Sequence, residues 1–242
     1  DRFRGDSGLI TQRLALRYQD RLARLFETHC TVGSPVLIDL GCGTGRLAVG
    51  FAERGFDVTG VDLSLEMLHR AAEKAAAANV NLSLVQANLC ELDCFIPGTY
   101  DTALLMFGTL GMIEGAGHRR RVLQYVAGLL RPGGIAALHV HNVWSHLFFP
   151  GNRRWLAADR LKALTGQTSA GDRRSPYRGI PNMYIHYFSQ RELRRELAAA
   201  GLAIRETIPL SLRQDAPLPP NGFNNNVRAG GWIVFAERRA DS

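Results

Sequence analysis

The chain has 242 residues, of which 46% are hydrophobic and 21% charged, with a net charge of +7. This length suits one α/β domain with additions and is short for two independent domains. No apolar run reaches the roughly 18 residues that a membrane helix needs, and the composition is ordinary for a soluble globular protein. The polar start, Asp1-Arg2-Phe3-Arg4, predicts no signal peptide, so we expect a cytoplasmic protein without membrane contact.

Four cysteines occur, at Cys30, Cys42, Cys90 and Cys94. Cys90 and Cys94 are four residues apart, but no second Cys or His pair stands near them to complete a zinc set. The sequence therefore predicts reduced thiols and no metal site.

Positive charge is concentrated between Gly117 and Ala200, a segment that contains 14 Arg or Lys residues and only 4 Asp or Glu residues. A localised basic face can attract an anionic partner. The alternative is a general preference for Arg at surface positions, which the presence of only two lysines, Lys74 and Lys162, favours.

The first part of the chain alternates short apolar runs with stretches of helical periodicity. The expected strands are Val36–Leu40, Asp57–Val61, Asn81–Gln86, Thr102–Phe107 and Ile135–His141. The expected helices are an N-terminal one within 9–29, one between Gly45 and Gly55, Ser64–Ala78 with Ser64 as N-cap, and His118–Leu130. This alternation indicates a parallel sheet that is covered on both faces.

The pattern changes after Asn142. We expect an inserted cap at about 143–182, with a helix near Arg154–Leu164 and a mobile loop at Gly166–Gly179. The remaining expected elements are a strand at Met183–Phe188, a helix to Ala200 opened by a Ser189/Glu192 capping box, and strands at Leu202–Leu210 and Gly231–Glu237. The whole chain, 1–242, is expected to form a single domain.

A glycine-rich loop follows the first expected strand, with the sequence Asp39-Leu40-Gly41-Cys42-Gly43-Thr44-Gly45. Glycines in this position allow a tight turn and a close approach of the backbone to a ligand. The start of the following helix favours negative charge, such as a pyrophosphate or a carboxylate.

Asp62 closes the second expected strand, 21 residues after Gly41. An acidic residue about 20 positions beyond such a loop can accept hydrogen bonds from both ribose hydroxyls of an adenosine ligand. The loop and the acid together, in a strand–helix–strand frame, predict an adenosine-containing cofactor.

The loop resembles the first motif of class I S-adenosylmethionine (SAM) methyltransferases, which carry an acidic residue two before the first glycine and a Gly-x-Gly-x-Gly spacing. The Gly-x-Gly-x-x-Gly spacing of nicotinamide enzymes is not found. Further segments resemble later motifs of the family: Val61-Asp62-Leu63-Ser64 with Met67, Gln86-Ala87-Asn88-Leu89, Tyr100–Leu110, and Leu129–Gly134.

The resemblance implies a SAM site, with S-adenosylhomocysteine (SAH) as product and no metal. It assigns the cofactor to Asp39, Gly41, Cys42, Gly43, Gly45, Asp62, Leu63, Met67, Asn88, Leu89, Met106 and Phe107. Asn88 stands where the family commonly has an acid that bonds the adenine amine, but its amide oxygen can still accept. Phe107 could equally be plain core.

The implied fold is a doubly wound, mostly parallel seven-stranded sheet with helices on both faces. The last strand is expected to be antiparallel, and a lid is expected after strand five. The implied activity is in-line transfer of a methyl group to an O, N or carboxylate acceptor of a small molecule.

Acceptor chemistry depends on the nucleophile, because a hydroxyl benefits from a general base whereas a carboxylate or neutral amine does not. The candidate catalytic residues are His141, His186 and Tyr184. His141 ends the fifth expected strand, where a doubly wound sheet opens its crevice. A buried structural role for the histidines is the alternative.

Two other functions remain open. The segment Asn182–Leu193 faintly resembles methyltransferases that esterify a carboxymethyl group on wobble uridine in tRNA, and the basic insert (Arg153, Arg154, Arg173, Arg174 and Arg178) would suit RNA phosphates. A non-catalytic SAM sensor or partner subunit is the other. Methylation of DNA amino groups is disfavoured because Met106-Phe107-Gly108-Thr109 replaces the Asn-Pro-Pro-Tyr type of motif. The oligomeric state is not predicted.

Overall fold

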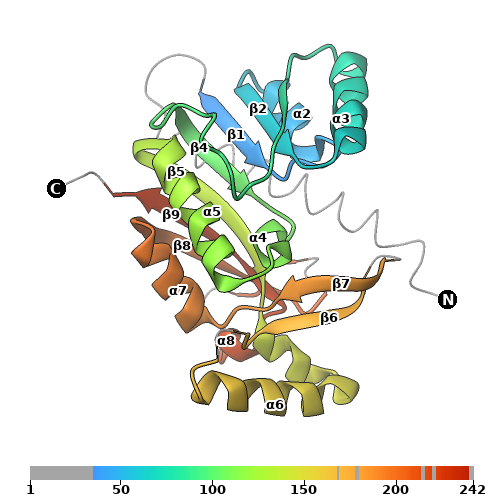
Figure 1. Cartoon of the computed structure of the whole chain (residues 1–242), viewed down its shortest axis with the longest axis vertical. Helices are drawn as coiled ribbons and strands as arrows, with labels where there is room; N and C mark the ends of the chain where they lie inside the picture. The colour runs from blue at the N-terminus through green and yellow to red at the C-terminus, as the bar shows by residue number, and fades with distance from the viewer. Residues whose placement is uncertain (1–34, 168, 178–179, 214–215, 220–221, 240–242) are drawn as a thin grey trace. The chain divides into compact units, whose positions relative to one another are not determined.

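A computed structural model describes residues 35–167, 169–177, 180–213, 216–219 and 222–239 (Figure 1). The expected N-terminal helix within 9–29 lies outside the described residues. The chain divides into two compact units. The first unit comprises Asp1–Leu105, Tyr125–Ala137 and Glu237–Ser242, and the second comprises Met106–Gln124 and Leu138–Ala236. The expectation of one domain stays a prediction.

Seven strands form a sheet in the order β3-β2-β1-β4-β5-β9-β8. Their bounds are β1 Val36–Leu40, β2 Asp57–Asp62, β3 Ser83–Gln86, β4 Tyr100–Leu105, β5 Leu130–His141, β8 Leu202–Leu210 and β9 Gly231–Arg238. The sheet is mostly parallel, its last strands are antiparallel, and helices flank it. This confirms the expected Rossmann-like α/β fold.

In the first unit, β1 is the central strand and pairs in parallel with both β2 and β4. Leu37, Ile38 and Leu40 of β1 are fully buried, as expected of an apolar strand that is covered on both faces. Residue Asp39 pairs in register with Gly60 of β2 and with Leu104 of β4. The glycine loop therefore begins at the carboxyl edge of the central strand.

Two helices follow the first two strands of this unit, α2 (Arg46–Ala52) and α3 (Leu65–Ala77). Gly45 precedes α2 with a φ of +68°, and a Cβ at this position would lie 2.9 Å from the Cβ of Ala71 in α3. Glycine is thus required for both the backbone conformation and the close packing of the helices. Ser64 caps α3 as expected, because its side chain accepts a hydrogen bond from the N–H of Met67.

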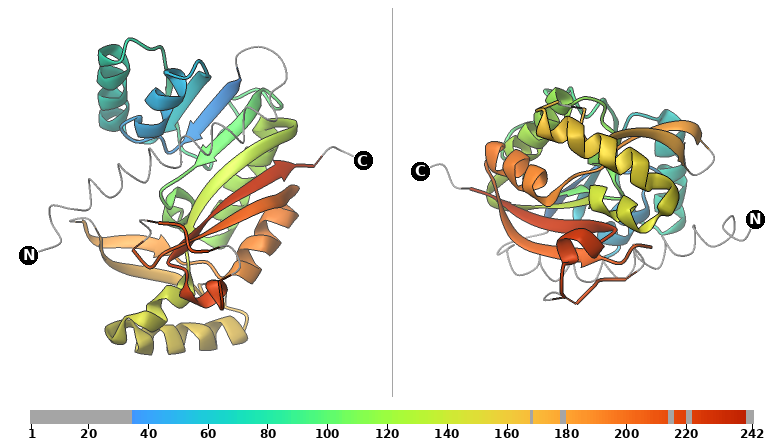
Figure 2. Two further views of the ribbon diagram at one scale, coloured as in Figure 1. Left: turned by 180° about the vertical axis from the view of Figure 1, so that it is seen from behind. Right: turned by 90° about the horizontal axis from the view of Figure 1, so that it is seen from below.

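The second unit contains a β-hairpin where a mobile loop was expected. β6 (Asp172–Tyr177) pairs antiparallel with β7 (Ile180–His186) (Figure 2). In this pairing Arg174 lies opposite Tyr184. The loop expectation is therefore wrong over 172–177. The Gly, Ser and Arg content suggested a loop, but pairing with β7 and the bond of Asp172 to the buried His186 hold this strand in place.

The inserted cap begins with two short 3-10 helices, η1 (Val143–Phe148) and η2 (Pro150–Asn152), followed by α6 (Arg153–Leu164). The expected cap helix is confirmed. The buried carboxylate of Asp159 in α6 accepts a 2.6 Å hydrogen bond from the N–H of Gly171, which joins α6 to the start of the hairpin.

Four further helices complete the described residues: α4 (Thr109–Met112), α5 (Ala116–Leu129), α7 (Gln190–Ala199) and α8 (Asn225–Arg228). The predicted capping box of α7 is present, with the Ser189 and Glu192 side chains each bonding the other's backbone N–H. The short helices α4 and α8 were not predicted. Strand β5 begins at Leu130 rather than Ile135, so it includes the Pro-Gly-Gly segment that precedes the expected strand. No described helix is long and apolar enough to cross a membrane.

Candidate functional site

The glycine loop is fixed by backbone hydrogen bonds. The N–H groups of Gly41 and Cys42 both donate to the carbonyl oxygen of Val61, over 2.7 and 3.0 Å, and the N–H of Gly45 donates to the carbonyl of Cys42. The side-chain ammonium of Lys74 in α3 also donates to the carbonyl and the hydroxyl of Thr44. The loop therefore has a defined shape set by β2 and α3.

Asp62 connects the loop to the end of β2. One carboxylate oxygen, Oδ2, accepts a 2.8 Å hydrogen bond from the N–H of Gly43, and the other, Oδ1, accepts a 2.9 Å hydrogen bond from the N–H of Ser64. A carboxylate oxygen has two lone pairs, so each oxygen can accept a second hydrogen bond. The carboxylate is thus oriented by the backbone and keeps the capacity to bind two hydroxyls.

The space beside Gly43 fits a bound group. Gly43 has a φ of +54°, and a Cβ built there meets no heavy atom within 4 Å. Gly41, two residues earlier, also has a positive φ, of +77°. The loop therefore presents bare backbone to an open space next to the Asp62 carboxylate, as a cofactor that packs against glycine would require.

Asp39, the residue before the last one of β1, is buried at 3% exposure. Burial, as the largest cause, and the negative charge of Asp62 together raise the pKa of its carboxyl to about 7, against the opposing effect of a hydrogen bond from the backbone of Ala48. Burial likewise raises the pKa of the neighbouring Cys42 thiol. The thiol is consequently neutral, and its Sγ packs 3.1 Å from the position of a Cβ on Gly60.

Two apolar side chains follow the acid. Leu63 is 68% exposed and Met67 is 37% exposed, although both are large and hydrophobic. Exposed apolar side chains next to a polar anchor can pack against the flat face of a base. Their position after Asp62 matches the part that the family resemblance assigns to adenine.

The third motif has a different local geometry. The side-chain oxygen of Asn88 accepts a 3.0 Å hydrogen bond from the N–H of Cys90, and Asn88 is exposed. Leu89 is buried at 7% exposure and contributes to the core. Of these two predicted cofactor residues, Asn88 alone presents a polar group to solvent, through its amide nitrogen and a second lone pair.

Met106 and Phe107, the last two predicted cofactor residues, belong to the second unit. Met106 is buried, whereas Phe107 has a φ of +59° and is followed by Gly108 at +85°. A large non-glycine residue with a positive φ is strained, and such strain concentrates at functional sites. A Cβ on Gly108 would lie 2.7 Å from Nε2 of His141, so glycine makes room for this imidazole.

His141 ends β5 and lies within a group of aromatic rings. It is 8% exposed, and its ring centroid is 5.2 Å from that of His139 and 5.8 Å from that of Tyr187. His141 therefore stands, as predicted, at the carboxyl end of the fifth strand, beside the residue that follows Phe107.

The other two predicted catalytic residues, Tyr184 and His186, belong to a network of charged groups. The hydroxyl of Tyr184 donates over 2.6 Å to Asp172, and it accepts a 2.8 Å hydrogen bond from the buried guanidinium of Arg119. His186 bonds Asp172 through Nδ1 at 2.7 Å and Glu192 through Nε2 at 2.9 Å. The network links α5, the hairpin and α7.

The environment of His186 favours its charged form. Burial lowers the pKa of the imidazole, but the hydrogen bonds to Asp172 and Glu192 raise it more, so the net shift is upward. Both ring nitrogens already have partners and the side chain is fully buried. This arrangement suits a positioning role. Burial and the bond to Asp172 raise the pKa of Tyr184 to about 12, which makes its hydroxyl a poor proton donor to a substrate.

His146, in η1, is a buried histidine that the sequence did not single out. It is 5% exposed, and its ring packs edge-on against Tyr187 at 4.4 Å and Trp155 at 4.7 Å. Its position within the unpatterned insert gave no periodicity from which to infer burial. Together with His141, these residues form what we call the aromatic cluster: His141, His146, Trp155 and Tyr187.

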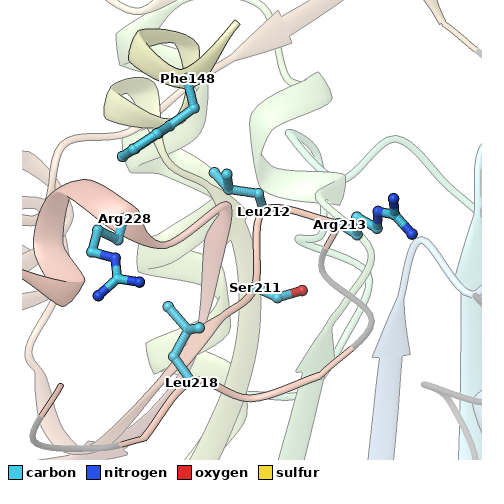
Figure 3. A pocket seen from close by; sticks show the side chains of 6 residues that line it. All are labelled: Phe148, Ser211, Leu212, Arg213, Leu218 and Arg228. Carbon is cyan, nitrogen blue, oxygen red and sulfur yellow. The ribbon is translucent and has the colours of Figure 1, made fainter.

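Two pockets of the second unit lie away from the predicted site residues. One has a volume of about 450 Å³ and is lined by Phe148, Ser211, Leu212, Arg213, Leu218 and Arg228 (Figure 3). The other has a volume of about 1130 Å³ and lies along α6 and α7, with Trp144, Arg160 and Arg191 in its wall. Neither contains a predicted catalytic or cofactor residue. Within the described residues, no group of three or more His, Cys, Asp or Glu side chains could hold a metal ion.

Comparison with known proteins finds methyltransferases among the relatives of this chain. Residues 37–134 match the family described as Methyltransferase domain.

A protein of Geobacillus sp. (strain WCH70) named as a methyltransferase is 36% identical over 133 residues, which cover 54% of this chain and 53% of that protein. The ubiquinone biosynthesis O-methyltransferase of Cronobacter sakazakii is 33% identical over 57% of this chain and 52% of its own length. The tRNA 5-carboxymethoxyuridine methyltransferase of Escherichia coli K12 is 30% identical over 52% and 49%. The chain spans about half the length of these curated relatives.

Solved structures of methyltransferases share the fold over most of the chain. A SAM-dependent methyltransferase from Methanosarcina mazei superimposes with a TM-score of 0.68 at 20% identity, over 90% of this chain and 98% of its own. The CcbJ methyltransferase from Streptomyces caelestis does so with a TM-score of 0.65 at 22% identity, over the full length of both. The fold is that of class I SAM-dependent methyltransferases. The part of the chain that carries the loop and Asp62 lies within the segment that matches the Methyltransferase domain family, residues 37–134.

Proposed function

We propose that the chain is a SAM-dependent methyltransferase that acts on a small-molecule acceptor. The observation that carries the proposal is the joint geometry of the loop and Asp62. Both oxygens of Asp62 are oriented by backbone N–H groups, one of them from Gly43, whose bare backbone borders an open space. The methyltransferase relatives support the same activity.

The residues present fit SAM. Asp62 would accept hydrogen bonds from the two ribose hydroxyls. Leu63 and Met67 would pack against adenine, and the loop around Gly43 would bind the methionine part. When bound, SAM supplies a methyl group that its sulfonium already activates. The chain's own residues therefore need to align the acceptor and exclude water rather than provide strong acid or base catalysis.

The acceptor is proposed to bind beside His141 and the aromatic cluster of the second unit. His141 is the predicted catalytic residue whose ring lies closest to the strained Phe107-Gly108 turn. His186 and Tyr184 have all their main polar atoms engaged with Asp172, Glu192 or Arg119. We therefore assign these two residues to positioning the hairpin and keep His141 as the candidate for acceptor contact.

An RNA acceptor is the second candidate, and the E. coli tRNA-modifying relative supports it. The arginines that would bind phosphate are, however, partly committed within the protein. Arg173 bonds His146 and Asn152, and Arg174 forms an ion pair with Glu114. Because fewer guanidinium groups are available to bind phosphate than the sequence suggested, we favour the small-molecule acceptor over RNA. The free thiols of Cys42 and Cys94 support a reducing compartment, and the cytoplasm is part of the proposal.

Calorimetric titration with SAH, combined with transfer of an isotope-labelled methyl group from SAM, tests the proposal. A cell extract separated into a small-molecule fraction and an RNA fraction supplies the acceptors. We expect SAH to bind and label to appear in the small-molecule fraction. Label in the RNA fraction alone would favour the tRNA-type activity, and SAH binding without transfer to either fraction would favour a sensor. An absence of SAH binding would refute the proposal.

A further inference from the structure

His146 is held by a closed set of hydrogen bonds. The guanidinium of Arg173 donates through one nitrogen to Nδ1 of His146 at 3.1 Å and through another to the side-chain oxygen of Asn152 at 2.8 Å. Because the oxygen of Asn152 accepts from Arg173, its amide nitrogen is the atom that lies 3.0 Å from Nδ1 of His146. Asn152 and Arg173 both donate to Nδ1.

This arrangement fixes the tautomer of His146. Nδ1 faces two donors and must act as an acceptor, so the ring proton resides on Nε2. The ring is also neutral, because burial and the positive charge of Arg173 lower its pKa to about 4, against an opposing effect of Asp159. Of the groups that act on the ring, Arg173 and His141 disfavour its protonation and only Asp159 favours it. His146 thus carries an Nε2–H donor at any pH above about 5.

The Nε2–H has no acceptor among the described residues. Nε2 of His146 is fully buried and makes no hydrogen bond. Buried donors without partners are rare in folded proteins and require an explanation. The other ring nitrogen, Nδ1, has two hydrogen-bond partners, so poor local packing does not account for the unpaired Nε2–H.

The surroundings indicate which kind of group could meet this donor. Trp155 and Tyr187, whose rings contact His146, are only half-buried, so they offer aromatic surface to a ligand. The guanidinium of Arg173 lies 5.0 Å from the centre of the Trp155 ring and adds positive charge. Flat apolar surface, a neutral donor and a nearby cation suit a planar ring that bears an anionic oxygen.

We propose that Nε2–H of His146 donates a hydrogen bond to an anionic oxygen on a planar, aromatic methyl acceptor that stacks beside Trp155 and Tyr187. That the ligand is a methyl acceptor rests on the proposed function, and the inference deepens that function by naming a substrate class. His146 is a recognition residue in this proposal and takes no proton.

Two substitutions separate the two ends of the ring. The side chain of His146→Asn can place its amide oxygen near the position of Nδ1, which keeps an acceptor for Arg173 and removes the Nε2–H donor. His146→Gln can place an amide N–H near the position of Nε2, which keeps the donor and removes the Nδ1 acceptor. His69→Asn, at an exposed position of α3, is the matched control.

The experiment is a ¹⁹F NMR titration of the full chain with 4-fluorobenzoate, with and without saturating SAH. The neutral 4-fluorobenzyl alcohol serves as the uncharged probe. We expect 4-fluorobenzoate to bind more tightly than the alcohol. His146→Asn should weaken it tenfold or more, whereas His146→Gln and His69→Asn should stay within about threefold of the wild type. Equal affinities in all variants, or a larger loss in His146→Gln than in His146→Asn, would overturn the inference.

A second measurement covers the case in which a variant does not fold. In wild-type protein labelled with ¹⁵N-histidine, Nε2 of His146 should be the protonated nitrogen at neutral pH, and its proton resonance should shift when 4-fluorobenzoate is added. A protonated Nδ1, or an Nε2–H resonance that the probe leaves unmoved, would overturn the inference. SAH affinity, measured separately, distinguishes this failure from that of the proposed function, because SAH binding does not depend on His146.

Discussion

The backbone N–H of Gly43 donates a 2.8 Å hydrogen bond to Oδ2 of Asp62, 19 residues further along the chain. This bond unites the glycine loop after β1 and the acid after β2 in one structural feature. Asp62 therefore shapes the loop, and in the proposed function its remaining lone pairs accept hydrogen bonds from the cofactor.

Gly43 and Gly45 should respond differently to alanine. Gly43→Ala should destabilise the fold only by the cost of a positive φ, about 1–2 kcal/mol, because its Cβ would meet open space. The same Cβ should obstruct the cofactor and weaken SAH binding. Gly45→Ala should reduce stability more, since its Cβ would lie 2.9 Å from that of Ala71. Thermal unfolding and SAH calorimetry give both quantities, and an unchanged SAH affinity in Gly43→Ala would contradict the placement of the ligand.

Asp39 should make the stability of the first unit depend on pH. Its folded pKa, about 7, lies above the ordinary value of 3.8, so the folded state binds more protons than the unfolded state between these values. The stabilisation is complete below pH 3.8 and is lost as the pH rises through about 7. Asp39→Asn should remove this dependence. Urea unfolding at pH 4.5, 6 and 8 measures it; wild type and variant with parallel profiles would show that Asp39 ionises normally.

The stability that His186 contributes should decrease as the pH rises. Its folded pKa is raised, so its stabilisation is complete below the ordinary value near 6.5 and is lost as the pH rises through the raised value. His186→Gln should cost about 3 kcal/mol at pH 6, because the half-buried carboxylates of Asp172 and Glu192 lose a charged, fully buried partner, and less at pH 9. The exposed His118→Gln serves as control. A difference that grows with pH would contradict the charged state.

Arg119 and Arg174 offer a matched pair of ion-pair removals. Arg119 is buried and bonds both Tyr184 and Asp172, whereas Arg174 is about half exposed and pairs with Glu114. Arg119→Gln should cost about 3 kcal/mol or more, and Arg174→Gln less than about 1 kcal/mol. Chemical denaturation measures both, and similar losses in the two variants would argue against the network around Asp172.

Periodicity and local signals were sufficient for the fold of the first unit. The apolar run at Val36–Leu40 could only be buried on both faces, and the hydroxyl of Ser64 marked the start of α3 because it caps a backbone N–H. The acid at position 62 was identified from its spacing after the glycines. Its second role, as the partner of the Gly43 N–H, could not be inferred, because it depends on the register of β1 with β2.

In the second unit, local sequence signals were not sufficient to predict the structure. Residues 172–177 have a composition typical of loops, and they form β6 by pairing with β7, where Asp172 bonds Tyr184 and His186. The same contacts engage the two residues that looked catalytic from their sequence pattern. The tautomer of His146 depends on Asn152 and Arg173, which no periodicity connects.

The most direct test of the central claim is SAH calorimetry on Asp62→Ala and on Asp57→Ala, an exposed aspartate at the start of the same strand. Loss of hydrogen bonds to a charged acceptor, worth about 1.5–3 kcal/mol each, predicts that Asp62→Ala weakens SAH at least tenfold. Asp57→Ala should bind as the wild type does. A folded Asp62→Ala variant with unchanged SAH affinity would contradict the account.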